Sequence, residues 1–345
     1  MMKQKMVMCL LTGVLVLGIG GCGTQEVEVP EVENVETAEE EPVPEETAEE
    51  EGDEQEKTDA EDQLKEVPTV DDAAESGKTE PEETEAASAP VVYEDGGQIT
   101  LDPSWTYADH SKINSGAAVL YKAAENRKEI VVGVNAGHGT SGGTKVKTLC
   151  HPDGSAKVTG GTTAAGATEA VAVSSGMTFN DGTPESSVTL RMAQILKEKL
   201  LSAGYDVLML RDGDDVQLDN VARTVICNNA ADCHIALHWD GDGLNYDKGC
   251  FYISVPDGLK SMEPVASHWS EHNALGSALV EGLRAQGAKI NGGGSMSIDL
   301  TQTSYSTIPS VDMELGNACS DHSDSVLDLL GNGLVQGVNS YFGQS

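Results

Sequence analysis

Basic residues, aromatic residues and long apolar runs are all scarce in this sequence of 345 residues. Lys and Arg together number 21 against 57 Asp and Glu, so the formal net charge is −36. An excess of negative charge on this scale argues against a nucleic-acid-binding surface, because such surfaces are basic. Aromatic residues make up 4% of the chain, and the apolar stretch at residues 6–18 is too short to span a bilayer as a helix.

Most of the negative charge lies in one segment. Residues 23–95 hold 29 acidic residues and three lysines, which accounts for −26 of the net charge. The segment has almost no aromatic residues, so it cannot bury enough apolar surface to offset the entropy cost of ordering. The sequence therefore predicts an acidic, disordered linker over residues 22–95 and one domain over residues 96–345.

The first residues of the chain have the pattern of an export signal. Lys3 and Lys5 precede the apolar stretch, and small residues follow it up to Cys22. The sequence LGIGGC resembles a bacterial lipobox, in which the cysteine becomes the lipidated first residue of the mature protein. We expect residues 1–21 to be a signal peptide and Cys22 to anchor the protein in a membrane outside the cytoplasm.

The remaining cysteines do not form a recognisable framework. Without Cys9 and Cys22 their number is five, and no CxxC pair occurs. An odd number in a domain with its own core does not indicate a disulfide scaffold, and the missing CxxC pairs argue against a zinc ribbon. We expect these thiols to be buried as small apolar groups, and the sequence leaves room for one disulfide.

Hydrophobic periodicity from residue 99 onward predicts strands alternating with helices. The strands are expected at residues 129–136, 205–210, 232–238, 250–255 and 310–315. The helices are expected at residues 117–128, from Thr183 to Gly204, at 218–228 and 270–286, and after a cap at Ser323. This order predicts a single α/β domain with a twisted, mainly parallel mixed sheet covered by helices on both faces. Residues 140–183 are rich in Gly, Thr and Ser and are expected to be a long insertion.

Two short motifs in the domain suggest other functions. Residues 137–142, GHGTSG, match GxGxxG after a strand, but no apolar helical stripe follows, as a dinucleotide site requires. His268 and His272 belong to an HxxEH sequence, which on a helix could place both histidines on one zinc with Glu271 as base. A metallopeptidase is therefore an alternative function, although a third ligand is missing from the motif.

A third set of residues is dispersed over the domain. His138 follows the strand at 129–136, Glu185 lies in the first turn of the next helix, and His238 and Glu314 end two further strands. Strand ends form the ligand crevice of an open α/β sheet. Two histidines and one carboxylate can hold a catalytic zinc with one position left for water, and a further carboxylate can take that water's proton. His234 lies about 13 Å from His238 along the same strand, so it is expected to be structural.

The order of these residues resembles the zinc-dependent N-acetylmuramoyl-L-alanine amidases of the amidase-3 family, which hydrolyse the bacterial cell wall. The resemblance runs from about residue 129 to 340. The matching segments are Gly137-His138-Gly139, Glu185, Arg211, Arg223, Asn228, Ala231-Asp232, Ala236-Leu237-His238 and Glu314-Leu315-Gly316.

The resemblance implies hydrolysis of the amide between N-acetylmuramic acid and L-alanine. It implies one Zn²⁺ held by His138, Glu185 and His238, with Glu314 as the general base and peptidoglycan as the substrate. We expect a monomer with no nucleic-acid partner. A non-catalytic wall-binding lipoprotein with a degenerate site is a further alternative.

The sequence also departs from the family at three places near the expected mouth of the site. The segment between His138 and Glu185 is longer than usual, Trp239-Asp240 replaces Ala-Asn, and Asn317 replaces Phe. We expect these differences to affect substrate contacts more than the metal chemistry, and the insertion to border the mouth. Arg211 and Arg223 are expected to pair with loop carboxylates.

Overall fold

The computed structural model describes residues 93–344. The predicted signal peptide, the predicted lipidation site Cys22 and nearly all of the acidic segment lie outside the described residues. Among the described residues, no helix is both long and apolar enough to cross a membrane.

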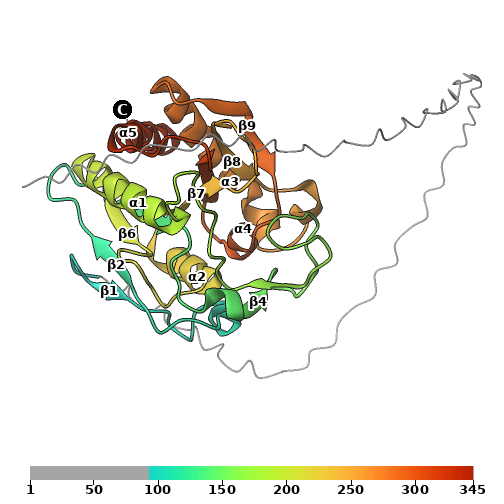
Figure 1. The fold of residues 1–345 in the computed structure, drawn as a ribbon. Helices are drawn as coiled ribbons and strands as arrows, with labels where there is room; N and C mark the ends of the chain where they lie inside the picture. Colours follow the sequence, from blue (N-terminus) through green and yellow to red (C-terminus); the bar gives the residue numbers. More distant parts are fainter. Residues whose placement is uncertain (1–92, 345) are drawn as a thin grey trace, which may run out of the picture. The chain divides into compact units, whose positions relative to one another are not determined.

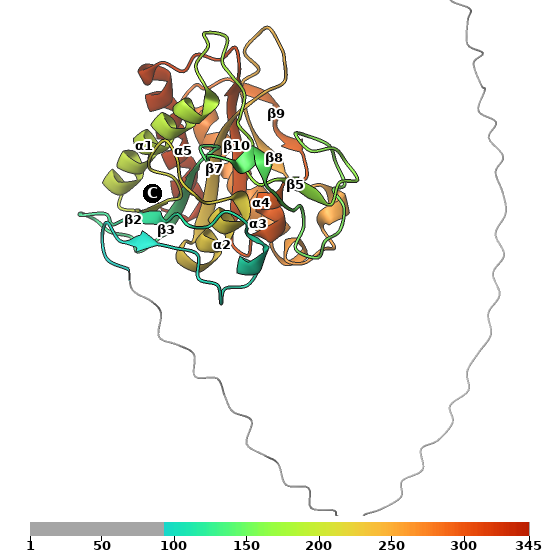
Figure 2. The same cartoon turned by 60° about the horizontal axis from the view of Figure 1, so that its bottom comes forward.

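An eight-stranded mixed sheet forms the centre of the domain, in the order β1-β2-β6-β3-β7-β10-β8-β9 (Figures 1 and 2). Its middle strands β6, β3, β7 and β10 are parallel, and β2 and β8 flank them in the antiparallel sense. The strands are β1 (Gln98–Ile99), β2 (Ala118–Tyr121), β3 (Val131–Ala136), β6 (Asp206–Met209), β7 (Cys233–Asp240), β8 (Cys250–Ser254), β9 (Ile290–Ser297) and β10 (Ser310–Asn317).

Helices cover both faces of this sheet, as the alternation of strands and helices predicts. One face packs against α1, α3 and α5 through the main apolar core, and the opposite face packs against α2. The short helix α4 contacts α2 and β10. The helices are α1 (Glu185–Ser202), α2 (Asn220–Ala230), α3 (Val265–Ala285), α4 (Thr301–Tyr305) and α5 (Asp324–Tyr341), with three-residue turns η1 (Ala108–His110), η2 (Gly143–Lys145) and η3 (Asp257–Leu259). The predicted fold class is confirmed.

The period of two along the strands decides which side chains enter the core and which face the other way. In β10, Val311, Met313 and Leu315 join the core with α1, α3 and α5. The residues between them, Asp312 and Glu314, therefore lie on the face that carries α2. The same alternation in β7 places Ile235 and Leu237 in that core and His238 on the face of Asp312 and Glu314.

The structure differs from the prediction in two elements. The helix expected at residues 117–128 is wrong: Ala118–Tyr121 forms β2, in which Ala118 and Leu120 are buried and the residues between them are half-buried. This is a strand pattern that is too short to separate from a helical one by periodicity. The Gly- and Ser-rich residues before β10 contain β9, whose eight residues are weak strand formers and pair in parallel with β8.

The insertion at residues 140–183 has little regular structure of its own. It contains η2 and a two-stranded antiparallel sheet of β4 (Lys147–Leu149) and β5 (Glu169–Val171). A buried network ties it to the main domain: Asp299 accepts hydrogen bonds from the backbone of Val158 and faces the His151 ring at 2.9 Å, while Lys157 donates to the carbonyl of Asp299. The insertion is therefore fixed on the domain near the end of β9.

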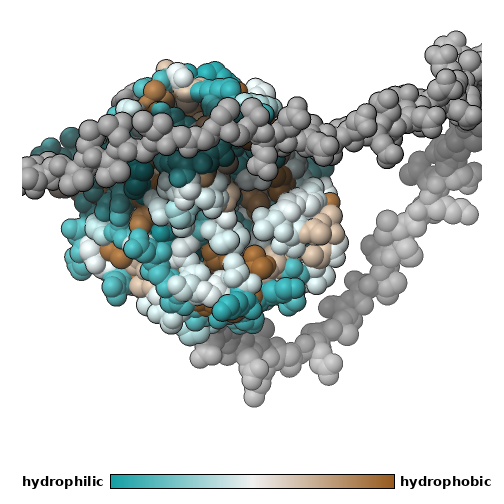
Figure 3. Space-filling view, in the orientation of Figure 1, coloured by the Kyte–Doolittle hydropathy of each residue, from teal (hydrophilic) through white to brown (hydrophobic). Residues whose placement is uncertain are grey.

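Polar side chains dominate the visible face of the domain. In Figure 3 the apolar residues on this face form small separate areas between hydrophilic ones. Val158 and Tyr246 are the large apolar residues that are exposed in the described part of the chain.

Candidate active site

The carboxyl ends of three neighbouring strands bring the predicted site residues together. His138 comes two residues after β3, and His238 and Glu314 stand side by side in the register of β7 and β10. Because β3, β7 and β10 are parallel neighbours, their ends meet at one edge of the sheet. Glu185 reaches the same place from the first turn of α1. All four residues line one pocket, as the sequence predicts.

His138, Glu185 and His238 form a tight triangle of potential metal ligands. Glu185 Oε1 lies 2.8 Å from His138 Nε2 and 3.2 Å from His238 Nδ1, and the two ring nitrogens are 3.1 Å apart. Ligand atoms of a tetrahedral zinc lie roughly 3.3 Å from one another, given zinc–ligand distances of about 2.0–2.1 Å. Within the described residues this is the single group of His, Cys and acidic side chains that is close enough to hold a metal. The donor types and spacing fit zinc.

The electrostatics of the triangle match a site built for a cation. Burial alone would raise the pKa of Glu185, but His138 and His238 outweigh burial and lower it. Burial lowers the pKa of His238, but Asp312 and Glu185 outweigh this effect and raise it to about 10. The concentrated negative charge thus favours a positive charge at this position, whether proton or metal ion.

The insertion supplies backbone partners that orient two of the three ligands. The ring of His138 donates from Nδ1 to the carbonyl oxygen of Ser174 at 2.9 Å, which leaves Nε2 facing Glu185. The backbone N–H of Met177 donates to Glu185 Oε2 at 2.8 Å, and that of Trp239 donates to Oε1 at 3.0 Å. Outer hydrogen bonds of this kind fix the orientation of metal ligands. The insertion therefore borders the site, and part of it supports the ligands directly.

Two glycines make room for the ligands. A Cβ on Gly137 would lie 2.3 Å from the ring of His238, which crosses this position from the adjacent strand. Gly176, in the insertion, has φ +81°, and a Cβ there would lie 2.7 Å from the ring of His138 and 2.8 Å from Glu185 Oε2. Larger residues at either position would displace the ligands.

Two buried arginines hold the segment that carries His138. Arg223 donates to the carbonyl oxygens of Ala136 and His138, and Arg211 donates to those of Ala136 and Gly137. Burial lowers the pKa of Arg211 to about 10 and that of Arg223 to about 9. The expectation that they pair with loop carboxylates is wrong.

These contacts explain the backbone of His138. Its φ is +66°, a conformation that non-glycine residues rarely adopt and that costs about 1–3 kcal/mol. Hydrogen bonds from charged guanidinium groups to the surrounding carbonyls are strong enough to hold it. The segment is thus pre-organised to present the ring of His138 to the other ligands.

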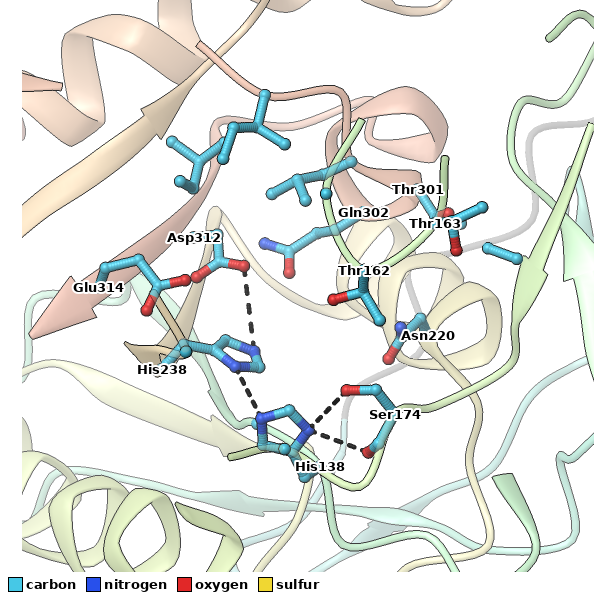
Figure 4. Close-up of a pocket in the computed structure, with 18 of the residues that line it drawn as sticks. His138, Thr162, Thr163, Ser174, Asn220, His238, Thr301, Gln302, Asp312 and Glu314 are labelled. Carbon is cyan, nitrogen blue, oxygen red and sulfur yellow. Dashed lines mark hydrogen bonds and ion pairs between the residues drawn. The ribbon is translucent and has the colours of Figure 1, made fainter. Parts of the chain in front are cut away.

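Glu314 and Asp312 form a second group of carboxylates on β10, beside His238 (Figure 4). Glu314 Oε2 and Asp312 Oδ1 are enclosed and have no hydrogen-bond partner in the structure. Burial and the neighbouring Asp312 raise the pKa of Glu314 well above its usual range, and burial raises that of Asp312. A carboxylate with a raised pKa is a stronger proton acceptor, which is what a general base needs.

The pocket that contains these groups has a volume of about 630 Å³. One side of its wall comes from the strand ends, and the opposite side comes from the insertion and α4 (Figure 4). The lining far from the ligands includes hydroxyl and amide groups, from Thr162, Thr163, Asn220, Thr301 and Gln302, beside apolar side chains such as Ile253, Ile298 and Leu300. Trp239 is not available to a ligand there, because it is 2% exposed and packs against Phe179 in the core.

The HxxEH motif does not form a metal site. It lies in the first turns of α3, whose apolar face is formed by Leu275, Leu279 and Leu283. The ring of His272 is buried, and its Nδ1 accepts a hydrogen bond from the backbone of Ser310. His268 instead pairs with the exposed Glu271 at 3.4 Å. No third ligand approaches this pair among the residues that the structure describes, so the metallopeptidase alternative is wrong.

The remaining expectations have clear outcomes. His234 is fully buried, and burial lowers its pKa to about 3. It is not one of the three residues grouped at the candidate metal site, so its structural role is supported. No helix opens at the GxGxxG segment, since η2 is a single turn, which excludes a dinucleotide site of that kind. The five cysteines of the domain are free, and Cys150, Cys227, Cys233 and Cys250 are buried.

Comparison with known proteins agrees with this site. The amidase-3 family model, described as N-acetylmuramoyl-L-alanine amidase, matches residues 132–328. The chain belongs to this family. It is therefore an N-acetylmuramoyl-L-alanine amidase that acts on peptidoglycan, outside the cytoplasm, and the non-catalytic alternative is discarded. His138, Glu185 and His238 fit the zinc site of the family.

Solved structures with this fold include two mycobacterial N-acetylmuramyl-L-alanine amidases. The enzyme of Mycobacterium abscessus is 21% identical, with a TM-score of 0.50, over 62% of this chain and 99% of the other. The enzyme of Mycobacterium smegmatis is 19% identical, with a TM-score of 0.52, over 64% of this chain and 99% of the other. These likenesses support the fold. No curated protein matches the sequence significantly.

Sequence reasoning missed several residues that support the amidase site. Ser174 and Met177 act through backbone atoms, which every residue type has, so their role cannot be recognised in the sequence. Asp312 did leave a mark, because a charged residue inside the buried strand SVDMELG needs a partner. Gly176 has the weaker signal of one glycine among many in the insertion.

Proposed function

We propose that this amidase is zinc-dependent, with the metal held by His138, Glu185 and His238 and with Glu314 as the general base. The observation that carries the proposal is the triangle of ligand atoms 2.8–3.2 Å apart, with outer hydrogen bonds that aim those atoms at one point. When bound, zinc supplies Lewis acidity that polarises the amide carbonyl and makes water a nucleophile at neutral pH.

In this proposal the carboxylate of Glu314 accepts a proton and later donates it. Its Oε2 has no hydrogen-bond partner, and its side chain stands beside His238 on the same face of the sheet. It takes a proton from the attacking water and returns it to the leaving amine of L-alanine as the amide bond breaks. The same group thus acts first as base and then as acid.

Analysis of the products tests the reaction. The purified domain, residues 96–345, is incubated with purified peptidoglycan, before and after removal of metal by a chelator and after addition of Zn²⁺. We expect new amino-terminal alanine and intact glycan strands from the zinc-loaded domain only. Activity that survives metal removal would contradict the zinc proposal, and new reducing ends without free alanine would contradict the assigned bond.

We also propose that residues 1–21 direct export and that lipidated Cys22 anchors the enzyme, with the acidic residues up to 95 as a spacer. The LGIGGC sequence and the charge of −26 over residues 23–95 support this arrangement. At full stretch, such a spacer reaches at most about 240 Å, enough to carry the domain into the wall.

Two single cysteine variants, one at the proposed lipidation site and one outside it, test the anchor. The Cys22→Ser variant should lose incorporation of labelled fatty acid and leave the membrane fraction. Cys9→Ser, in the apolar part of the signal, is the matched control and should behave like the wild type. Labelling that persists in Cys22→Ser would refute the anchor.

A further inference from the structure

Asp312 lies in the pocket beside the proposed ligands without a defined task in the reaction. It is two residues before Glu314 on β10, and its side chain points into the pocket with Oδ2 3.9 Å from His238 Nε2 (Figure 4). The residue is 9% exposed, and its Oδ1 has no hydrogen-bond partner. A buried carboxylate is costly to keep unless it interacts with a cation or a donor.

The ring of His238 is the donor that Asp312 faces. Its Nδ1 points at Glu185 and His138, so Nδ1 is the ligand nitrogen. A neutral imidazole that gives the lone pair of Nδ1 to a metal carries its proton on Nε2. That N–H points toward the carboxylate of Asp312, which lies within reach of a direct hydrogen bond after a small rotation or of one bridging water.

Folding stability alone does not explain a carboxylate at this position. Glu185 and Asp240 also line the pocket, and their carboxylates repel a negative charge on Asp312. The flanking Val311 and Met313 are fully buried and apolar. An apolar residue at 312 would remove this repulsion and a desolvation cost, and the favourable interaction that it would lose is the one with His238.

We propose that Asp312 is a positioning residue, which accepts the Nε2–H of His238 and so fixes the tautomer and the ring orientation that aim Nδ1 at zinc. This inference rests on the proposed zinc site. Carboxylate partners of metal-bound histidines raise the basicity of the ligand nitrogen as well as orienting it. His138 has the equivalent contact from a neutral carbonyl, that of Ser174, so the two histidine ligands are held by different groups.

Zinc affinity, measured by competition with a chelator, tests this role without reference to turnover. Asp312→Leu removes both the charge and the acceptor, and we expect zinc to bind about 10- to 100-fold more weakly. Asp312→Asn keeps the size and one acceptor, and should lose less affinity. Asp240→Asn removes an equal charge from the same pocket, where Asp240 pairs with Lys248 rather than His238. It measures the general electrostatic effect and should stay within about threefold of the wild type.

A second measurement separates positioning from a structural role. The metal-free Asp312 variants lose the attraction to His238 but are relieved of repulsion and of a desolvation cost, so their stability to denaturant should change less than their zinc affinity does. Nitrogen NMR of the zinc-loaded wild type should show the Nε2 of His238 protonated, with a shifted signal in Asp312→Asn.

Four outcomes decide the proposal. Asp312→Leu affinity no weaker than that of Asp240→Asn would overturn it, as would a loss of metal-free stability that matches the loss of affinity. A wild-type domain that binds no zinc would instead refute the proposed function. Weaker zinc binding without a matching loss of metal-free stability supports Asp312 as a positioning residue.

Discussion

Two pairs of histidines in this domain look equally capable of binding zinc when only side-chain types are counted. His268 and His272 are four residues apart on α3, whereas His138 and His238 are 100 residues apart and end neighbouring strands. The ring centroids of the helical pair are 6.4 Å apart, and those of the strand-end pair are 4.6 Å apart. A metal site thus depends on where the ring nitrogens point and on a third ligand, and closeness in sequence provides neither.

Burial lowers the pKa of one histidine in each pair, but the net shift has the opposite sign in the two. His272 faces an apolar interior and burial lowers its pKa to about 3, so it stays neutral. His238, whose side chain is 21% exposed, also has its pKa lowered by burial, but Asp312 and Glu185 outweigh this and raise the pKa to about 10. A histidine thus serves packing in one region and a cation-attracting site in the other, and neighbouring carboxylates make the difference.

Loss of one ligand gives the largest expected difference between the two regions. His138→Ala should lower the zinc content from one per domain to near zero and abolish hydrolysis, since two remaining ligands hold the metal poorly. His268→Ala should keep both the zinc and the hydrolytic activity. Metal analysis of the purified variants checks this, and zinc retained in the first but lost in the second would reverse the assignment.

Replacement of the two candidate bases, Glu314 and Glu271, should give the next largest difference, which is a difference in kcat. Glu314→Gln keeps the size of the side chain but cannot accept a proton, so kcat should fall by about 100- to 10,000-fold. Glu271→Gln, in the HxxEH motif, should have near-normal kcat. Zinc content should stay near one in both variants, and the melting temperature of Glu314→Gln should be unchanged or higher, as is common for catalytic carboxylates.

Either of two results would exclude this role for Glu314. A Gln variant without zinc would make Glu314 a ligand, and near-normal turnover would remove it from the mechanism. A fall in stability together with activity would indicate that Glu314 orders the neighbouring loop instead.

Shortening the insertion should have a smaller effect, which is on the relative activity toward large and small substrates. Deleting all of residues 140–183 would remove the backbone groups that hold His138 and Glu185, so such a deletion should weaken zinc binding as well. A shorter cut is available, because Lys157 and Gly166 are hydrogen-bonded to each other. Replacing residues 158–165 with two glycines removes the part that carries Thr162 and Thr163 into the pocket.

This shortened loop should leave zinc content unchanged. We expect kcat/KM on intact peptidoglycan to fall about tenfold, the equivalent of one or two lost hydrogen bonds, and kcat/KM on a small muramoyl peptide to change less. Parallel assays on the two substrates check this. An equal loss on both would argue that the loop shapes the catalytic centre rather than a distant contact.

The smallest effect concerns stability against acid. His272 and His234 have pKa values near 3 in the folded protein, against about 6.5 in an unfolded chain. Between these values the unfolded chain binds protons that the folded chain does not, so stability falls as the pH drops below 6.5. The slope is at most about 1.4 kcal/mol per pH unit for each histidine.

His272→Gln should flatten this dependence. Denaturant unfolding of the metal-free domain at pH 6.5 and 5.5 measures it, with His268→Gln as the control at a more exposed position of the same helix. A His272→Gln domain that loses as much stability as the wild type would show that His272 does not remain neutral in the fold.

The parts of the site that the sequence predicted share one property: each is a side chain whose chemistry is distinctive and whose place follows from a strand or helix boundary. His138 follows one buried strand, His238 and Glu314 lie toward the ends of two others, and Glu185 opens a helix marked by Thr183-Pro184. The strands themselves were recognisable from runs of β-branched residues, as in Glu129 to Ala136. The helix α1 begins after Pro184 without a side-chain cap from Thr183, which changes its boundary but not the position of Glu185.

The failures have a common cause as well. The strand β2 resembles a short helical segment, and five of the eight residues of β9 are glycine or serine, so both depend on pairing with a neighbour that local pattern does not reveal. Arg211 and Arg223 were expected to pair with carboxylates, because a positively charged side chain is attracted to a negatively charged one. Their partners are carbonyl oxygens of the segment around His138, which any residue type could provide.

The sequence by itself determined the fold class, the ligand types and their order along the chain, because these follow from hydrophobic period and from side chains with few alternative uses. Only the tertiary structure decided which nitrogen of each ring faces Glu185 and which backbone groups hold His138 and Glu185. It also placed Asp312 opposite His238. Those choices depend on sheet register and on the path of the insertion, where contacts between distant segments are made by backbone atoms that are the same in every residue.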